Sequence, residues 1–181
     1  MKDTIIVNFF AGPGCGKSTG ASWLFSQLKI NGVDCEYVTE FAKDKVWENN
    51  GEVFKCEFYI TGKQSFKISR CFGKVDVIIT DSPIAISMAY SESDKFKAAV
   101  LEEFNKYEKN NLNILLRRVV PYDPNGRIQK NEGEAKQIDE TIQGVLDGNN
   151  IPYTIINGNT DGYQVIVDMV LEELERRRKN K

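Results

Sequence analysis

The sequence predicts an α/β fold in which a parallel five-stranded sheet is covered by helices on both faces. Two observations support this prediction: an apolar strand leads directly into a glycine-rich loop, and five apolar runs alternate with helical segments. The predicted strands are Ile5–Phe10, Cys35–Thr39, Val75–Thr80, Leu112–Leu116 and Tyr153–Ile156. We expect a single domain over residues 1–181, because the chain is too short for two comfortable cores.

The segments between the strands have helical periodicity. Lys17–Ile30, Ser93–Lys109 and Asp161–Arg178 place apolar side chains three or four residues apart, which predicts helices with one buried face. The last of them runs into a basic tail over residues 176–181. We interpret this tail as a solvated helix end that complements the helix dipole, with nucleic-acid contact as the alternative.

Composition limits the chemistry that the chain can perform. The chain is 41% hydrophobic and 28% charged with a net charge of −2, and it contains no apolar run near the roughly 20 residues that a membrane span needs. No signal peptide is visible, so we expect a cytoplasmic protein with four free cysteines. The absence of histidine means that any acid–base chemistry must fall to a carboxylate.

Residues Ala11–Thr19 read Ala-Gly-Pro-Gly-Cys-Gly-Lys-Ser-Thr and lie between the first predicted strand and helix. This order is typical of a P-loop, whose backbone N–H groups wrap the phosphates of a nucleoside triphosphate; the alternative is an ordinary glycine turn. Lys17 is expected to reach the terminal phosphates and Ser18 to bind Mg²⁺, while Ala11 replaces the first glycine of the strict pattern. The predicted phosphate-binding residues are Gly12, Pro13, Gly14, Cys15, Gly16, Lys17, Ser18 and Thr19.

Asp81 ends the third predicted strand, and this pattern is typical of a Walker B strand. A carboxylate at this position lies beside a P-loop and binds Mg²⁺ directly or through water. Asp81 suits this role better than Asp76, which lies at the start of the strand and therefore at the far edge of the sheet. The alternative is that Asp81 caps a helix that begins at Pro83.

Glu40 follows the second predicted strand, so it should face the same crevice as the P-loop. There it would accept the proton of a hydroxyl that attacks a phosphoryl group. The alternative is that Glu40 is a solvated residue at a helix N-terminus.

Two loops at the same edge complete the predicted site. The loop over residues 117–131 contains prolines and a glycine, and it reads as a lid in which Arg127, with Arg117 or Arg118, contacts the triphosphate. After the fifth strand, Asn157 and Gly158 are expected to border the nucleotide base.

Together these features resemble the P-loop kinase family of nucleoside and nucleotide kinases over nearly the whole chain. The Ile-Thr-Asp-Ser-Pro stretch, the Gly-Arg lid and the small size look like phage-encoded members that phosphorylate 5-hydroxymethyluracil bases in DNA. The resemblance implies the strand order 2-3-1-4-5, ATP and Mg²⁺ as cofactors, and the host cytoplasm as location if a phage encodes the protein. It also implies that Lys17, Glu40, Asp81 and Arg127 are catalytic, with Ser18 and Asp81 on the metal.

The acceptor is expected to bind to residues 41–74, a long helical segment with many aromatic and basic side chains. These aromatic side chains are suited to stacking on a base, although core packing is their commoner use. The predicted function is transfer of the γ-phosphoryl group of ATP to a hydroxyl of a nucleoside, a nucleotide or a hydroxymethylated base in DNA. The alternative is an NTPase switch or motor subunit without such an acceptor. A homodimer is left open by the sequence, and no membrane contact is expected.

Overall fold

The computed structural model describes residues 1–125, 129 and 131–180. Five parallel strands form one sheet in the order β2-β3-β1-β4-β5, which confirms the predicted fold class and strand order. The strands are β1 (Ile5–Phe10), β2 (Cys35–Val38), β3 (Val77–Thr80), β4 (Asn111–Arg117) and β5 (Thr154–Asn157). Their bounds lie within two residues of the predicted ones.

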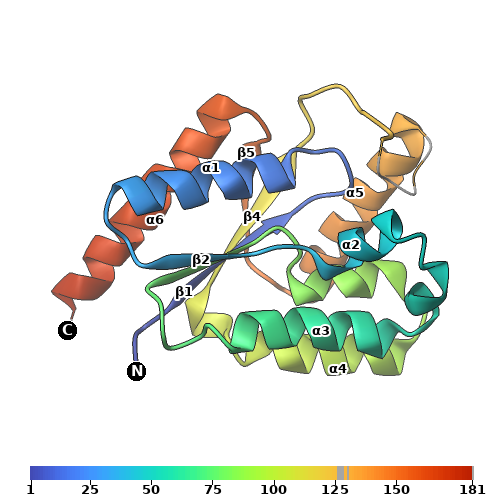
Figure 1. Cartoon of the computed structure of the whole chain (residues 1–181), viewed down its shortest axis with the longest axis horizontal. Coiled ribbons are helices and arrows are strands. Elements are labelled where there is room, and N and C mark those ends of the chain that lie inside the picture. The colour runs from blue at the N-terminus through green and yellow to red at the C-terminus, as the bar shows by residue number, and fades with distance from the viewer. Residues whose placement is uncertain (126–128, 130, 181) are drawn as a thin grey trace.

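Helices connect the strands and cover both faces of the sheet (Figure 1). Helices α1 and α6 pack on one face, while α3, α4 and α5 pack on the other. The α-helices are α1 (Lys17–Ile30), α2 (Phe41–Trp47), α3 (Glu57–Ser69), α4 (Asp94–Asn105), α5 (Glu132–Gly148) and α6 (Thr160–Lys179). Three short 3₁₀ helices accompany them: η1 (Gly51–Lys55), η2 (Ile84–Tyr90) and η3 (Glu108–Asn110).

Two predicted helices differ from the structure. The segment over residues 41–74 is not one helix: α2 stops at Trp47, and Asn49 has a left-handed backbone with φ of 53° that breaks the helix before η1 and α3. Helix α4 ends at Asn105, four residues before the predicted end, and η3 follows it.

The central strand β1 is buried along its whole length and contributes to both layers of the core. Ile5, Val7 and Phe9 face α1 and α6, whereas Ile6 and Phe10 face the opposite layer, as the two-residue period of a strand requires. Both neighbours, β3 and β4, are hydrogen-bonded to β1, so its carboxyl end is fixed from two sides. The loop that follows therefore starts from the buried centre of the sheet.

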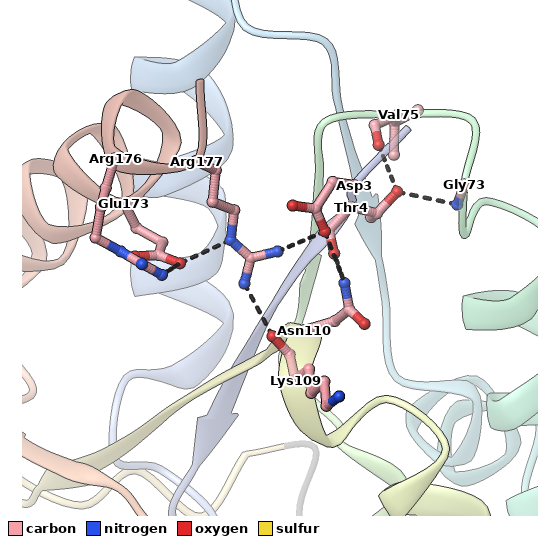
Figure 2. A network of polar contacts seen from close by, with 9 residues as sticks. All are labelled: Asp3, Thr4, Gly73, Val75, Lys109, Asn110, Glu173, Arg176 and Arg177. Carbon is pink, nitrogen blue, oxygen red and sulfur yellow. Dashed lines mark hydrogen bonds and ion pairs between the residues drawn. The ribbon is translucent and has the colours of Figure 1, made fainter. Parts of the chain in front are cut away.

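A polar network closes the amino edge of the sheet (Figure 2). The Thr4 hydroxyl donates to Val75 O at 2.6 Å and accepts from Gly73 N at 2.9 Å. Asn110 Nδ2 donates to Thr4 O at 2.8 Å, which joins the start of β4 to the start of β1. These bonds satisfy backbone groups that would otherwise be left unpaired where the strands begin.

The end of α6 belongs to the same network, and its arginines are paired within the chain. Arg177 donates to Asp3 at 2.9 Å, to Lys109 O at 3.0 Å and to Glu173 at 2.7 Å, and Arg176 also donates to Glu173 (Figure 2). These bonds tie the end of α6 to the segment just before β1. The basic tail therefore has a structural role in addition to the predicted one of a solvated helix end.

Within the part of the chain that the structure describes, no helix combines the length and apolar character that a membrane crossing requires. All four cysteines lie in that part and are free thiols, as expected.

Glu173 should make stability depend on pH. The hydrogen bonds from Arg176, and then those from Arg177, lower the pKa of Glu173 from 4.5 to about 2. Because the folded-state pKa is depressed, the stabilisation is fully present above pH 4.5 and is lost as the pH falls toward 2. It amounts to at most about 3 kcal/mol, at about 1.4 kcal/mol per pKa unit.

Urea unfolding of wild type and Glu173→Gln between pH 3 and pH 7 measures this effect, on the order of 1–3 kcal/mol at neutral pH. The difference in free energy of unfolding should shrink toward acid pH. Glu175→Gln, on the exposed side of the same helix, is the matched control and should show almost no difference. If the difference in free energy of unfolding between wild type and Glu173→Gln stays constant with pH, the lowered pKa of Glu173 does not stabilise the fold.

Candidate functional site

The loop between β1 and α1 has the backbone shape of a phosphate cradle. Gly14 and Gly16 have φ of 72° and 86°, a left-handed region that only glycine adopts readily. Helix α1 begins directly after Gly16, with no side-chain cap and no acidic residue in its first turn. Its first N–H groups and the positive end of its dipole are therefore available to an anion at the loop.

Contacts from three other elements hold this loop from behind. Asp139 of α5 accepts a hydrogen bond from Gly12 N at 2.7 Å, and the Tyr163 hydroxyl of α6 donates to Gly16 O at 3.0 Å. Cys15 is buried, and its Sγ donates to Leu116 O of β4 at 3.3 Å. Burial raises the pKa of Cys15 to about 11, so the thiol is a protonated filler rather than a nucleophile.

Gly158 lies against the back of the same loop. A Cβ at this position would meet Cys15 O at 2.4 Å, and Gly158 N donates to Arg117 O at 2.9 Å. The turn after β5 therefore approaches the loop so closely that only glycine fits. Asn157 precedes it at the end of β5, and the predicted role of this turn beside a base stays a prediction.

Lys17 points back across the loop, where its ammonium donates to Ala11 O at 2.7 Å and to Gly12 O at 2.9 Å. Burial lowers the pKa of Lys17, and the charges of Glu40 and Asp81 oppose that shift. Ser18 and Thr19 follow in the first turn of α1, and Lys17, Ser18 and Thr19 all line the cleft described below.

Asp81 follows β3 directly and is only 3% exposed. Its Oδ2 accepts a hydrogen bond from the Tyr37 hydroxyl at 2.8 Å, while its buried Oδ1 has no partner among the described residues. Burial first, and then Asp81, raise the pKa of Tyr37, whereas Ser18 lowers it. Ser18 and Asp81 both line the cleft described below. A buried carboxylate oxygen without a partner fits a magnesium ion, whose ligands in proteins are oxygens.

The alternative role of Asp81 as a helix cap is not observed. Pro83, not Asp81, precedes the 3₁₀ helix η2, and the Asp81 side chain bonds to Tyr37 instead. Asp76 lies at the opposite edge of the sheet, where it pairs with Lys2 at 3.3 Å, so it does not belong to this site.

Glu40 lies between β2 and α2, as predicted, and its side chain does not cap the helix that it precedes. Burial raises the pKa of Glu40, and the nearby Lys17 lowers it. The structure therefore brings Lys17, Glu40 and Asp81 to one cleft from three strand ends.

Gln64 of α3 braces the two carboxylates and is only 4% exposed. Its side-chain oxygen accepts from Phe41 N at 3.1 Å, next to Glu40, and its amide nitrogen donates to Thr80 Oγ1 at 3.3 Å, next to Asp81. Lys67, one turn later on α3, donates to Thr39 O at 2.5 Å on the other side of Glu40. This brace could not be predicted from the sequence, because a lone glutamine in a helix carries no local signal.

Arg118 does not hang over the cleft as the lid prediction had it. It is 6% exposed on its side chain and forms an ion pair with Asp139 at 2.8 Å, and it donates to Pro13 O at 2.9 Å. Arg117 ends β4 and is exposed. Arg127, the main candidate of the predicted lid, lies outside the described residues, so the lid over residues 117–131 stays a prediction.

A cleft of about 570 Å³ runs from the P-loop to the wall formed by α2, η1, α3 and η2. Among the aromatic side chains of the predicted acceptor-binding segment, Phe54 lines the cleft, whereas Trp47, Phe58, Tyr59 and Phe66 are exposed. Part of the wall comes from η2 and α4, which the sequence analysis did not assign to the site. The residues of the far half are Ala42, Lys43, Val46, Phe54, Glu57, Ile60, Thr61, Gln64, Pro83, Ile84, Ile86, Ser87, Tyr90, Phe96, Asn125 and Gln129.

Removal of Asp139 should destabilise the fold and loosen the loop. Asp139→Ala leaves the buried Arg118 guanidinium without its carboxylate and Gly12 N without its acceptor. Because Asp139 is partly exposed, we expect a loss of about 2–3 kcal/mol, below the usual cost of breaking a fully buried pair. Urea unfolding measures the loss against Glu140→Ala, an exposed neighbour on α5. Equal stabilities of the two variants would mean that the ion pair does not hold the loop.

A family described as "AAA domain" matches residues 6–162, from β1 to the start of α6. No curated protein matches the chain. The matched region contains the P-loop, Glu40, Asp81 and all of the sheet except Ile5. The fold, the loop and the match agree, and the chain belongs to the AAA domain family, whose members have a nucleotide-binding P-loop.

Proposed function

We propose that the chain is an ATP-dependent kinase that phosphorylates a hydroxyl of a nucleoside, a nucleotide or a hydroxymethylated base in DNA. The observation that carries the proposal is the shape of the cleft, which continues past Lys17, Glu40 and Asp81 into a walled space away from the P-loop. An NTPase that only hydrolyses its nucleotide needs no such space, so the cleft favours a second ligand over the switch or motor alternative.

Each residue has a physical task in this scheme. The ammonium of Lys17 and the N–H groups at the start of α1 stabilise charge on the phosphates. Ser18 and Asp81 would hold Mg²⁺, which neutralises charge on the β- and γ-phosphate oxygens when bound. Glu40 orients the acceptor hydroxyl and takes its proton.

The reaction is an in-line displacement at phosphorus. The acceptor oxygen forms a bond to the γ-phosphorus as the bond between that phosphorus and the β–γ bridging oxygen breaks. The hydroxyl proton passes to Glu40, and the products are a phosphorylated acceptor and ADP. The raised pKa of Glu40 suits this task, because a carboxylate with a higher pKa is a stronger base.

The outer surface of α3 supports DNA as one source of the acceptor. Phe58 and Phe66 are exposed there, and the Lys63 ammonium lies 5.5 Å from the ring centroid of Tyr59. Unpaired bases stack on exposed aromatic rings, and neighbouring cations bind the phosphates of the strand.

The direct test is incubation with ATP labelled on its γ-phosphate and a panel of nucleosides, nucleotides and DNA oligonucleotides that contain 5-hydroxymethyluracil. Label on an acceptor supports the kinase, and label only on free phosphate supports the NTPase alternative. Lys17→Ala should lower transfer on the order of a hundredfold or more, because it removes charge stabilisation from the transition state.

Substitutions of Glu40 and Asp81 should impair activity in different ways. Asp81→Asn should raise the Mg²⁺ concentration needed for activity, because it removes a charged ligand. Glu40→Gln should leave ATP affinity close to that of wild type and lower transfer about a hundredfold or more. Wild-type activity should also fall with acid as Glu40 is protonated, at a pH above 4.5 because its pKa is raised, and Glu40→Gln should lose this dependence.

Fluorescence titration of ATP and Mg²⁺, together with transfer rates from pH 4 to pH 8, separates the two roles. Asp76→Asn, at the other end of β3, is the matched control and should leave both readouts unchanged. The assignment is wrong if ATP affinity collapses in Glu40→Gln but not in Asp81→Asn.

Gln64 should matter for transfer more than for ATP binding. Gln64→Met keeps the volume but removes both hydrogen bonds of the brace, so Glu40 and Asp81 lose their fixed separation. Because small misplacements of catalytic groups are costly, we expect kcat to fall about ten- to a hundredfold while the Kd for ATP changes little. Gln137→Met on the exposed face of α5 is the control. A parallel loss of ATP affinity would indicate a general structural defect instead.

A further inference from the structure

The hydroxyl of Tyr37, on β2, holds one oxygen of the Asp81 carboxylate. It donates a hydrogen bond to Oδ2 at 2.8 Å, whereas Oδ1 is buried and has no partner among the described residues. Asp81 is only 3% exposed, so bulk water does not readily satisfy Oδ1. The two oxygens therefore differ: Oδ2 is engaged within the chain, and Oδ1 is left for a ligand.

The phenol ring of Tyr37 is fixed from two sides. Its strand is paired with β3, where Tyr37 lies opposite Ile79, two residues before Asp81. On the helix side, the ring packs against Phe25 of α1, with the two ring centroids 6.4 Å apart. Both rings border the part of the hydrophobic core that lies between the sheet and α1. The hydroxyl therefore reaches Asp81 from a backbone and a ring that are held by pairing and packing.

Ser18 lies on the same face of α1 as this ring contact. Ser18, Ser22 and Phe25 are four and three residues apart, a spacing that places side chains on one side of a helix. Burial, the largest effect, and then Asp81 raise the pKa of the Tyr37 phenol, whereas hydrogen bonding with Ser18 and Ser22 lowers it. A phenol oxygen can donate one hydrogen bond and accept another, so Tyr37 is able to serve both Asp81 and Ser18.

We propose that Tyr37 is a positioning residue of the magnesium site, which engages Asp81 Oδ2 so that only Oδ1 is available to the cation, and which keeps the Ser18 hydroxyl beside it. This inference rests on the magnesium role of Ser18 and Asp81 in the proposed function and deepens it. Residues that hold a metal-binding carboxylate in place typically account for about ten- to a hundredfold in metal affinity.

The same hydrogen bond should affect which cation binds. Mg²⁺ is small, requires nearly ideal octahedral geometry and is usually bound by few carboxylates together with substrate phosphates. Ca²⁺ accepts more oxygens and often binds both oxygens of one carboxylate. Because Tyr37 engages Oδ2, Asp81 is restricted to binding through one oxygen, which favours Mg²⁺ over Ca²⁺.

Calorimetric titration with β,γ-imido-ATP, an analogue that is not hydrolysed, tests this role without turnover. The Kd is measured for wild type and for Tyr37→Phe, which removes only the hydroxyl, in excess Mg²⁺, in excess Ca²⁺ and in EDTA. We expect the Kd of the variant to rise about tenfold or more in Mg²⁺, to rise less in Ca²⁺ and to stay unchanged in EDTA. Equal rises in Mg²⁺ and Ca²⁺ would contradict the selectivity.

The matched control is Tyr153→Phe, which removes another tyrosine hydroxyl that donates to an aspartate, Asp147, at 2.7 Å. It should leave all three Kd values unchanged. A double-mutant cycle with Asp81→Asn then separates positioning from general support. A residue that acts through Asp81 has no carboxylate left to position in that background, so adding Tyr37→Phe should cause little further change in Mg²⁺. Additive rises in Kd would show that Tyr37 does not act through Asp81.

The outcomes distinguish this inference from the proposed function. If wild type binds the analogue no more tightly in Mg²⁺ than in EDTA, the magnesium role of Asp81 is wrong, and Tyr37 has no cation to select. If wild type prefers Mg²⁺ but Tyr37→Phe has the same three Kd values, or raises all three equally, the inference about Tyr37 is wrong and the magnesium role stands. The choice between kinase and NTPase is decided separately, by the labelled-ATP experiment.

Discussion

The rest of the structure depends on a single constraint: the backbone N–H groups of residues 14–16 must stay free to face an anion, so the loop has to be held from its other side. Asp139, Tyr163 and the turn at Gly158 provide that support from α5, α6 and the end of β5. None of these contacts occupies the start of α1, where an anion would lie. The strand order β2-β3-β1-β4-β5 fits this constraint. Because β1 is central, strands flank it on both sides, and α5 and α6 both reach the loop that follows it.

The polar groups at the two edges of the sheet differ in whether they have partners within the chain. At the amino edge, polar groups such as Thr4, Asn110 and Arg177 are fully engaged with one another and close the fold. At the carboxyl edge, the buried Asp81 Oδ1 has no partner among the described residues. A buried polar atom without a partner is costly, so this oxygen points to a ligand rather than to stability.

Much of the fold and the centre of the site could be predicted from the sequence. Parallel strands put their carboxyl ends at one edge, so the order of apolar runs was enough to bring Lys17, Glu40 and Asp81 together. The supports could not be predicted in this way: Asp139 binds a loop 127 residues before it, and neither periodicity nor a motif announces such a contact. Arg118 was misjudged for the same reason, because an arginine that follows a strand looks solvated until its buried partner is known.

Helix α3 links the wall of the cleft to the two carboxylates. One face of this helix carries Glu57 and Thr61 toward the far half of the cleft, and the next turn carries Gln64, which bonds to the residues beside Glu40 and Asp81. The wall of the cleft and the bonds that hold the chain beside Glu40 and Asp81 are therefore built on one helix. A ligand that packs against α3 in the cleft would contact the element that fixes the separation of the two carboxylates.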